Sequence, residues 1–339
     1  MNKCKWMIAV LLFASAVPLP ASEPVAPVEG TAADTATAPA PVFTGGVAGF
    51  ASIVRAEHSA DYRAGGGGLY LHNNGWEALD DDQRRQALTL FADRPVAIEL
   101  GFHPIDGWPA LYRRAYLPHG IAPAFIAANA FAGNNLPTPE QWARYTRGLR
   151  EAGVGDDTPI LPTFEYANFG ENLPTLPDNL LSGRDDFQQI VLDAGGLVLD
   201  TPPQYFFARE QAYRDWVLDA LRWCHARGLY TVVIVSPHAS GEAFPDDTDR
   251  FVDYLAEHDA MPAAWVCENY EPNPADDYPN TVGHEDARAT TLGVGLRLLQ
   301  RLAEHSAPPK DWEPKQKGQA SCRSFGGAEP SALFRPAVG

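Results

Sequence analysis

The feature that most constrains the fold is a regular alternation of short apolar runs with longer amphipathic stretches. The apolar runs, for example 95–102 and 230–235, have the length and the β-branched content of buried strands. The stretch 210–227 repeats its apolar residues at helical spacing and is followed by Gly228, a residue type that often ends helices. Because strands that are apolar throughout are buried on both faces, the alternation predicts a parallel sheet covered by helices.

The number of strands favours a closed barrel over an open sheet. Seven strand candidates lie between Leu69 and Cys267, and Gly49–Val54 is a possible eighth. Eight strands and a span of about 250 residues are typical of a (β/α)8 barrel. An open doubly wound sheet is the rival, but no Gly-x-Gly-x-x-Gly motif follows the first strand. The sequence therefore predicts an α/β protein with a single TIM-like (β/α)8 barrel domain.

The two ends of the chain differ in composition from this core. Residues 1–21 place two lysines before an apolar run that is too short to span a bilayer, which predicts a secretory signal peptide. Residues 22–48 lack an apolar period and are expected to form a disordered Ala/Pro-rich linker. The catalytic barrel is then expected at 49–306, with an irregular or disordered tail at 307–339. We therefore expect an exported protein, periplasmic or extracellular.

The net charge limits the possible partners. A formal charge of -17 repels phosphate backbones and anionic lipids, so we expect no nucleic-acid partner and no membrane insertion after signal cleavage. The glycine run 65–68 lacks the lysine and the following helix of a phosphate-binding loop, and no cofactor is expected. A neutral or cationic ligand, such as a carbohydrate substrate, fits this charge, and no obligate protein partner is evident.

Three cysteines remain after removal of the signal peptide: Cys224, Cys267 and Cys322. In an exported protein they permit one disulfide and one free thiol, in any of the possible pairings. Cys224 lies in an amphipathic helix and Cys267 in an apolar strand, so we expect both to be small buried side chains.

Polar residues recur at one end of nearly every predicted strand. In a (β/α)8 barrel the carboxyl ends of the strands line one pocket, so these residues are expected to meet there. Two tryptophans in the predicted strand-to-helix loops are either sugar-stacking surfaces or ordinary packing aromatics. The candidate binding residues, in chain order, are His72, Asn73, Trp76, Glu99, His103, Trp108, Asn129, Tyr166, Asn168, Asp200, His238, Asn269 and Tyr270.

Glu165 and Glu268 stand out because each is a carboxylate at the end of an apolar strand. Burying a charge in such a place is unfavourable unless the charge is paired or used. Hydrolysis of a glycosidic bond uses two carboxylates, one as general acid and, in the retaining reaction, one as nucleophile. Opposing strands of a barrel can hold two carboxylates at the required separation.

In this placement the chain resembles the superfamily of retaining barrel glycosidases, whose acid/base ends the fourth strand and whose nucleophile ends the seventh. Counted from Leu69, Glu165 ends the fourth strand and Glu268 the seventh, although Phe164 replaces the asparagine that usually precedes the acid/base. The resemblance implies an enzyme that cleaves a poly- or oligosaccharide with Glu165 as acid/base and Glu268 as nucleophile. Four neighbouring side chains would orient these groups or bind hydroxyls: Tyr166, Asn168, Asn269 and Tyr270.

Two other functions compete with this one. The order Glu165, Asp200, His238, Glu268 is similar to the divalent-metal ligands of barrel sugar isomerases and epimerases, and such ligands would suit manganese or magnesium. Alternatively, the barrel binds glycan without catalysis, and its glutamates are satisfied by backbone amides or by an arginine, for which Arg209 is the nearest candidate.

Overall fold

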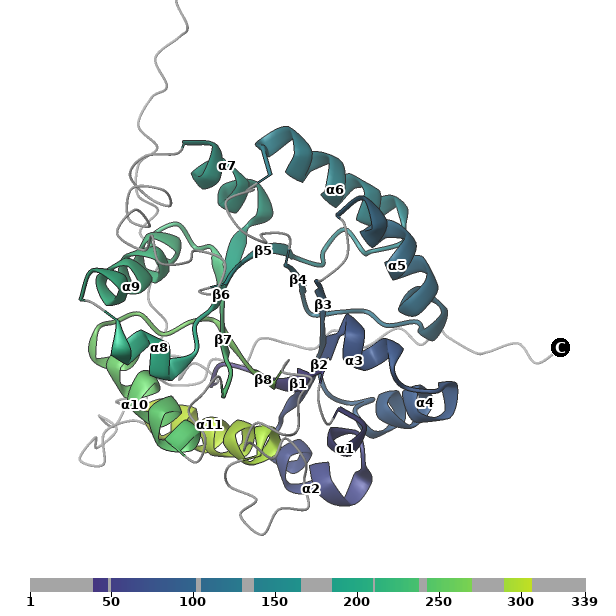
Figure 1. Ribbon diagram of the computed structural model, residues 1–339, viewed down its shortest axis with the longest axis horizontal. Coiled ribbons are helices and arrows are strands. Elements are labelled where there is room, and N and C mark those ends of the chain that lie inside the picture. The colour runs from purple at the N-terminus through teal and green to yellow at the C-terminus, as the bar shows by residue number, and fades with distance from the viewer. Residues whose placement is uncertain are drawn as a thin grey trace, which may run out of the picture. The chain divides into compact units, whose positions relative to one another are not determined.

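The described chain forms a closed barrel of eight parallel strands with helices around its outside (Figure 1). The computed structural model describes residues 39–47, 50–101, 105–129, 137–165, 185–209, 211–237, 243–269 and 290–306, without the side chains at 51, 52, 105, 165 and 185–187. Each strand pairs with the next along the chain, and the last pairs with the first. The prediction of a (β/α)8 barrel is therefore confirmed.

The strands are short and mainly apolar, as expected for strands covered on both faces. Their bounds are β1 Val42–Gly46, β2 Gly68–His72, β3 Val96–Leu100, β4 Ile126–Ala128, β5 Ile160–Glu165, β6 Gly196–Asp200, β7 Tyr230–Val235 and β8 Ala264–Asn269.

Two of the helices, α4 and α6, begin at a capping box that is visible in the sequence. Asp80 and Thr138 each form a capping box at the start of a helix, with Gln83 and Gln141 as the returning side chains. The helices are α1 Phe50–Ile53, α2 Ala56–Ala64, α3 Asn73–Glu77, α4 Asp81–Leu90, α5 Trp108–Ala115, α6 Pro139–Glu151, α7 Asp185–Ala194, α8 Pro203–Ala208, α9 Gln211–His225, α10 Phe244–Glu257 and α11 Thr291–Ser306, with 3-10 turns η1 Ile105–Gly107 and η2 Leu117–His119. No helix among these is long and apolar enough to cross a membrane.

The first strand differs from the prediction. The segment 49–54, expected as a possible strand, contains helix α1, whereas β1 lies at 42–46, inside the segment expected to be linker. Its two glycines look like a turn in the sequence, but Gly45 is required by packing. A Cβ at that position would lie 1.9 Å from the carbonyl oxygen of Tyr70. The barrel therefore begins at Val42 and not at residue 49.

This earlier start changes the strand numbering on which the glycosidase resemblance depends. Glu165 ends β5 and Glu268 lies near the end of β8, so the predicted placement on the fourth and seventh strands is wrong. The two strands are also not opposite each other in the barrel, because two strands, β6 and β7, separate them in the strand order.

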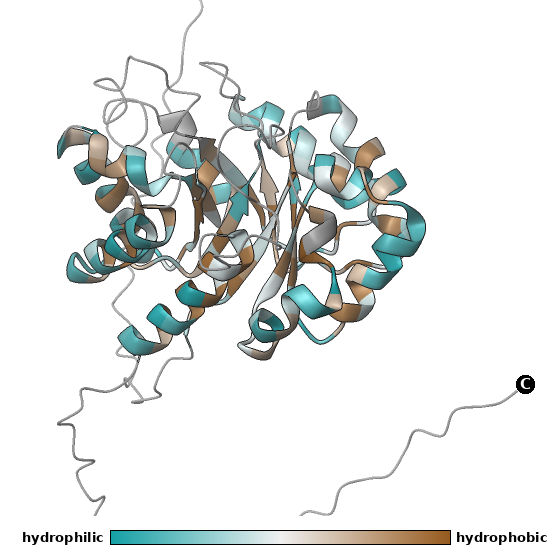
Figure 2. Ribbon diagram, turned by 60° about the horizontal axis from the view of Figure 1, so that its bottom comes forward, coloured by the Kyte–Doolittle hydropathy of each residue, from teal (hydrophilic) through white to brown (hydrophobic). Residues whose placement is uncertain are grey.

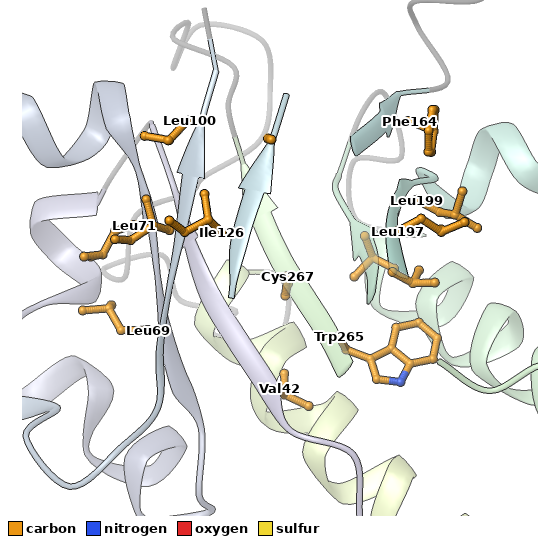
Figure 3. Close-up of a cluster of buried hydrophobic side chains, with 14 of the residues drawn as sticks. Val42, Leu69, Leu71, Leu100, Ile126, Phe164, Leu197, Leu199, Trp265 and Cys267 are labelled. Carbon is orange, nitrogen blue, oxygen red and sulfur yellow. The ribbon is translucent and has the colours of Figure 1, made fainter. Parts of the chain in front are cut away.

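Apolar side chains fill both faces of the barrel wall. Those that point outward pack against the helices and include Val42, Leu71 and Trp265 (Figure 3). Those that point inward form a second cluster, including Phe43 and Phe125, whose rings meet edge to face with centroids 5.2 Å apart. The helices present their polar residues outward and their apolar residues toward the sheet (Figure 2). The barrel interior is thus a packed core and leaves the carboxyl ends of the strands for the site.

The two described cysteines are small buried side chains, as expected. Cys224 and Cys267 are both buried and neither forms a disulfide. Cys322 lies outside the described residues.

Candidate functional site

The inward side chains near the carboxyl ends of the strands form two polar layers. In a barrel of this type alternate strands contribute the four side chains of each layer, and successive strands are staggered by about one residue. The strand register then gives an upper layer from the even-numbered strands: His72, Asn129, Asp200 and Glu268. A lower layer comes from the odd-numbered strands and consists of Gly45, Glu99, Thr163 and Ile234.

These layers hold all the buried acidic and basic side chains of the described part of the protein. Glu99 and Glu268 are each 2% exposed, Asp200 is 7% exposed and His72 is 1% exposed. No lysine or arginine in the described ranges is buried. Since buried carboxylates are rare and require hydrogen bonds or charge partners, three of them in one place indicate a functional site.

Glu99 accepts hydrogen bonds on both of its carboxylate oxygens. Tyr70 Oη donates to Oε2 at 2.8 Å, and Asn129 Nδ2 donates to Oε1 at 3.1 Å. His72 Nε2 lies 3.7 Å from the same Oε1, beyond hydrogen-bond length but close enough for electrostatic attraction. Glu99 therefore links the two polar layers.

Tyr70 lies beneath Glu99 and is influenced by all three carboxylates. Burial, followed by the negative charges of Glu99, Glu268 and Asp200, raises the pKa of the Tyr70 hydroxyl well above its ordinary value of 10.0. The hydroxyl therefore stays protonated and acts as a donor. Tyr70 is not among the predicted site residues, because a tyrosine inside an apolar strand looks like core. Its position two residues before His72, on the same face of the strand, is the signal that would have found it.

His72 is held as a neutral ring. Its Nδ1 accepts a hydrogen bond of 3.2 Å from the backbone N–H of Asn74, which caps helix α3. Burial lowers the pKa of His72 below 6.5, while the charge of Glu99 acts in the opposite direction. In the neutral ring the proton must then reside on Nε2, the nitrogen that faces Glu99.

The neighbouring Asn73 connects two strand ends. Its Oδ1 accepts a hydrogen bond of 3.0 Å from the backbone N–H of Gly101, directly after β3. Asn269, at the end of β8, is also buried, and its backbone oxygen accepts a hydrogen bond of 2.8 Å from Val47 N. Both asparagines are thus placed at the carboxyl end of the barrel, as expected.

Two hydroxyl groups at the same end are buried without a hydrogen-bond partner among the described residues. They are Thr163 Oγ1 on β5 and Ser236 Oγ, directly after β7. A buried hydroxyl that has no protein partner is available to a bound polar molecule or water.

Of the two alternatives for Trp76 and Trp108, the structure shows ordinary packing aromatics and not sugar-stacking surfaces. Trp76 is 0% exposed, and its Nε1 donates a hydrogen bond of 2.7 Å to the Ala115 carbonyl. Its ring stacks on Tyr116 with centroids 6.3 Å apart. Trp108 is 1% exposed and begins helix α5. The polar loop expected around Trp76 is instead helix α3, which turns this ring toward the neighbouring helix.

Several predicted site residues lie outside the described residues. These are His103, Tyr166, Asn168, His238 and Tyr270, together with the side chain of Glu165. The backbone of Glu165 pairs with that of Asp200 on β6. The described ranges contain no group of three or more His, Cys, Asp or Glu side chains that could hold a metal ion. The alternative metal site needs His238 and the Glu165 side chain and stays a prediction.

A cavity of about 660 Å³ lies away from the strand ends, between helices α8, α9, α10 and α11. Most of its charged side chains pair with one another across the helices. Arg297 contacts Asp249 at 2.7 Å, and Arg301 contacts Asp253 at 2.6 Å. These ion pairs hold helix α11 against helix α10. We therefore assign the charged lining of this cavity a structural role.

No protein-family model matches the chain, and no curated protein sequence matches it. Similar solved structures include KGPDC from Streptococcus mutans, at 8% identity and a TM-score of 0.47, covering 78% of this chain and 98% of that one. A citrate lyase from Burkholderia xenovorans LB400 is 14% identical, with a TM-score of 0.41 and coverage of 81% and 78%. The Haloferax volcanii malate synthase lead(II) complex is 12% identical, with a TM-score of 0.38 and coverage of 85% and 78%. Function must therefore be argued from the site itself.

Proposed function

We propose that this protein is a glycoside hydrolase that uses Glu268 as nucleophile and Glu165 as acid/base. The observation that carries the proposal is the gathering of three buried carboxylates, Glu99, Asp200 and Glu268, around Tyr70 at the carboxyl end of the barrel. Cleavage of an acetal needs a proton donor for the leaving oxygen and a negative charge near the oxocarbenium-like centre. A cluster of buried acids supplies both.

The relative position of the two glutamates supports the proposal even though their strand numbers differ from the family pattern. Strands β5 and β8 are three steps apart in the closed barrel, as the fourth and seventh strands are. Each step around an eight-stranded barrel turns by a similar angle. Two strand ends three steps apart therefore have similar relative geometry wherever the count begins.

Hydrogen bonding and layer position separate the roles of Glu99 and Glu268. Both oxygens of Glu99 accept hydrogen bonds within the protein, so it is not assigned to the chemical step. Glu268 belongs to the upper layer, where its carboxylate can face a bound sugar. Asn129 in the same layer, with the hydroxyl of Ser236 directly after β7, supplies groups that hydrogen-bond to sugar hydroxyls.

The test is hydrolysis of a panel of oligo- and polysaccharides by the purified protein, measured as release of reducing ends. For a cleaved substrate, we expect Glu268→Gln and Glu165→Gln each to lower kcat/KM by about 100-fold or more. Glu151→Gln is the matched control, since this exposed residue ends helix α6 on the outside of the barrel. We expect this control to retain full activity.

Three outcomes would contradict the proposal. Full turnover by either glutamine variant would remove that glutamate from the mechanism. Loss of activity on chelation, with recovery on adding manganese or magnesium, would favour the metal-dependent alternative. Calorimetric binding of a glycan without any cleavage of it would make the barrel a binding protein.

A further inference from the structure

We propose that Glu99 is a positioning residue that fixes the orientation of Asn129 and His72 in the upper layer and does not contact the substrate. This inference rests on the proposed function only in that the bound molecule is taken to be a sugar. The sequence analysis had placed Glu99 among the groups that touch substrate.

The geometry around Glu99 is that of an acceptor surrounded by donors. Tyr70 Oη approaches one oxygen at 2.8 Å, while Asn129 Nδ2 at 3.1 Å and His72 Nε2 at 3.7 Å approach the other. An ionised carboxylate only accepts hydrogen bonds, and each of these neighbours has a proton to offer. A carboxylate therefore offers an acceptor oxygen to each of these neighbours. An amide cannot do so, because one of its two terminal groups is an NH2 donor.

The strand register places Glu99 one layer below Asn129 and His72. Glu99 is 2% exposed, whereas Asn129, the last described residue after β4, is only partly buried. Asn129 thus lies between Glu99 and the carboxyl end of the barrel. A ligand that enters from this end would meet Asn129 before Glu99.

The consequence for Asn129 is a fixed amide orientation. Asn129 Nδ2 donates to Glu99 Oε1, so the amide turns its NH2 group toward this carboxyl group. The Oδ1 atom of Asn129 is then left as an acceptor for a partner other than Glu99. With the sugar as that partner, Asn129 would accept a hydrogen bond from a substrate hydroxyl.

The consequence for His72 is a fixed tautomer. The backbone N–H of Asn74 occupies Nδ1, and Glu99 faces Nε2. The neutral ring therefore carries its proton on Nε2, and both ring nitrogens are directed at protein groups. His72 then shapes the floor of the site and takes no part in proton transfer.

The first test is NMR of the histidine ring nitrogens in the full-length wild-type protein, with His72 assigned by loss of its signals in His72→Asn. We expect the Nε2–H tautomer for His72 at neutral pH. We expect Glu99→Gln to shift its pKa further down, because the opposing charge is lost. An Nδ1–H tautomer in the wild type would overturn the inference, as would an unchanged His72 titration in Glu99→Gln. This test needs no substrate, so it decides the inference even if no glycan is cleaved.

The second test is a kinetic cycle on a cleaved glycan. If Glu99 acts through Asn129, Glu99→Gln and Asn129→Ala should each raise KM by about 10-fold with a smaller change in kcat. The double variant should then be no worse than Asn129→Ala alone. Additive effects, or loss of kcat at unchanged KM in Glu99→Gln, would overturn the inference. If Glu99→Gln fails to fold, an Nδ1–H tautomer in the wild type would still overturn the inference. Glu151→Gln serves again as the matched control.

Discussion

The substitution Trp76→Ala separates a core tryptophan from a sugar-binding one. In the structure, the Trp76 ring is completely buried, stacks on Tyr116 and lies 5.8 Å beneath the guanidinium of Arg84. Removing a buried tryptophan side chain typically costs about 3–5 kcal/mol. The lost hydrogen bond from Nε1 to Ala115 is part of that cost, at about 1 kcal/mol. Since domains unfold at about 5–15 kcal/mol, the variant should lose a large share of its stability.

The measurement is urea unfolding followed by far-ultraviolet circular dichroism, with the free energy of unfolding extrapolated to water. Trp223→Ala is the matched control, because Trp223 is only partly buried on helix α9. We expect its loss to be clearly smaller than that of Trp76→Ala. Trp76→Phe should fall between the two, since it keeps an aromatic ring and removes the indole N–H.

A loss below about 1 kcal/mol in Trp76→Ala would refute this reasoning, because that is the cost expected of an exposed side chain. The refutation would be complete if the same variant bound a glycan more weakly. In that case the ring would have to leave the core to reach a ligand.

Three further predictions can be checked by the same unfolding measurement. Gly45→Ala should destabilise the protein by at least about 3 kcal/mol, because its Cβ would lie 1.9 Å from the Tyr70 carbonyl oxygen; equal stability would contradict the close approach of β1 and β2. Asp253→Asn should lower the free energy of unfolding by up to about 1 kcal/mol, with a larger loss at low salt than at high salt. The reason is that Arg301, which is partly exposed, holds the pKa of this carboxyl below 3.8 through an ionic contact that salt screens. A loss independent of salt would argue against an ionic cause. Burial lowers the pKa of His72 in the folded protein below 6.5, so on acidification the unfolded chain binds a proton at this residue before the folded protein does. The free energy of unfolding should therefore fall as the pH drops below about 6.5. A similar pH dependence in His72→Asn would show that another group causes the effect.

The barrel class could be predicted because it is encoded locally. Strands such as 230–235 are apolar along almost their whole length, and helix 210–227 shows its period within a few turns. Each pattern indicates that its own segment is buried, but it does not indicate which other segment covers it. The polar residues at the strand ends, among them Asp200 and Glu268, were visible for the same reason.

Tertiary contacts decided what the local patterns could not. In the sequence, Gly45 and Gly46 look like a turn. In the structure they belong to a strand, and the neighbouring strands leave no space for a side chain at either position. Trp76 looks like a loop residue until its partner Ala115, 39 positions away, covers it. A pattern within one segment contains no information about such distant neighbours.

The site, like the fold, was predictable where it depends on local sequence and unpredictable where it depends on tertiary contacts. The sequence by itself determined which acids lie at strand ends, because a charge inside apolar residues is conspicuous. Only the closed barrel decided that Glu99 lies in the lower layer beside Tyr70, 29 positions away, with Asn129 above it. The stagger of the strands sets those layers, and the stagger exists only once all eight strands have paired.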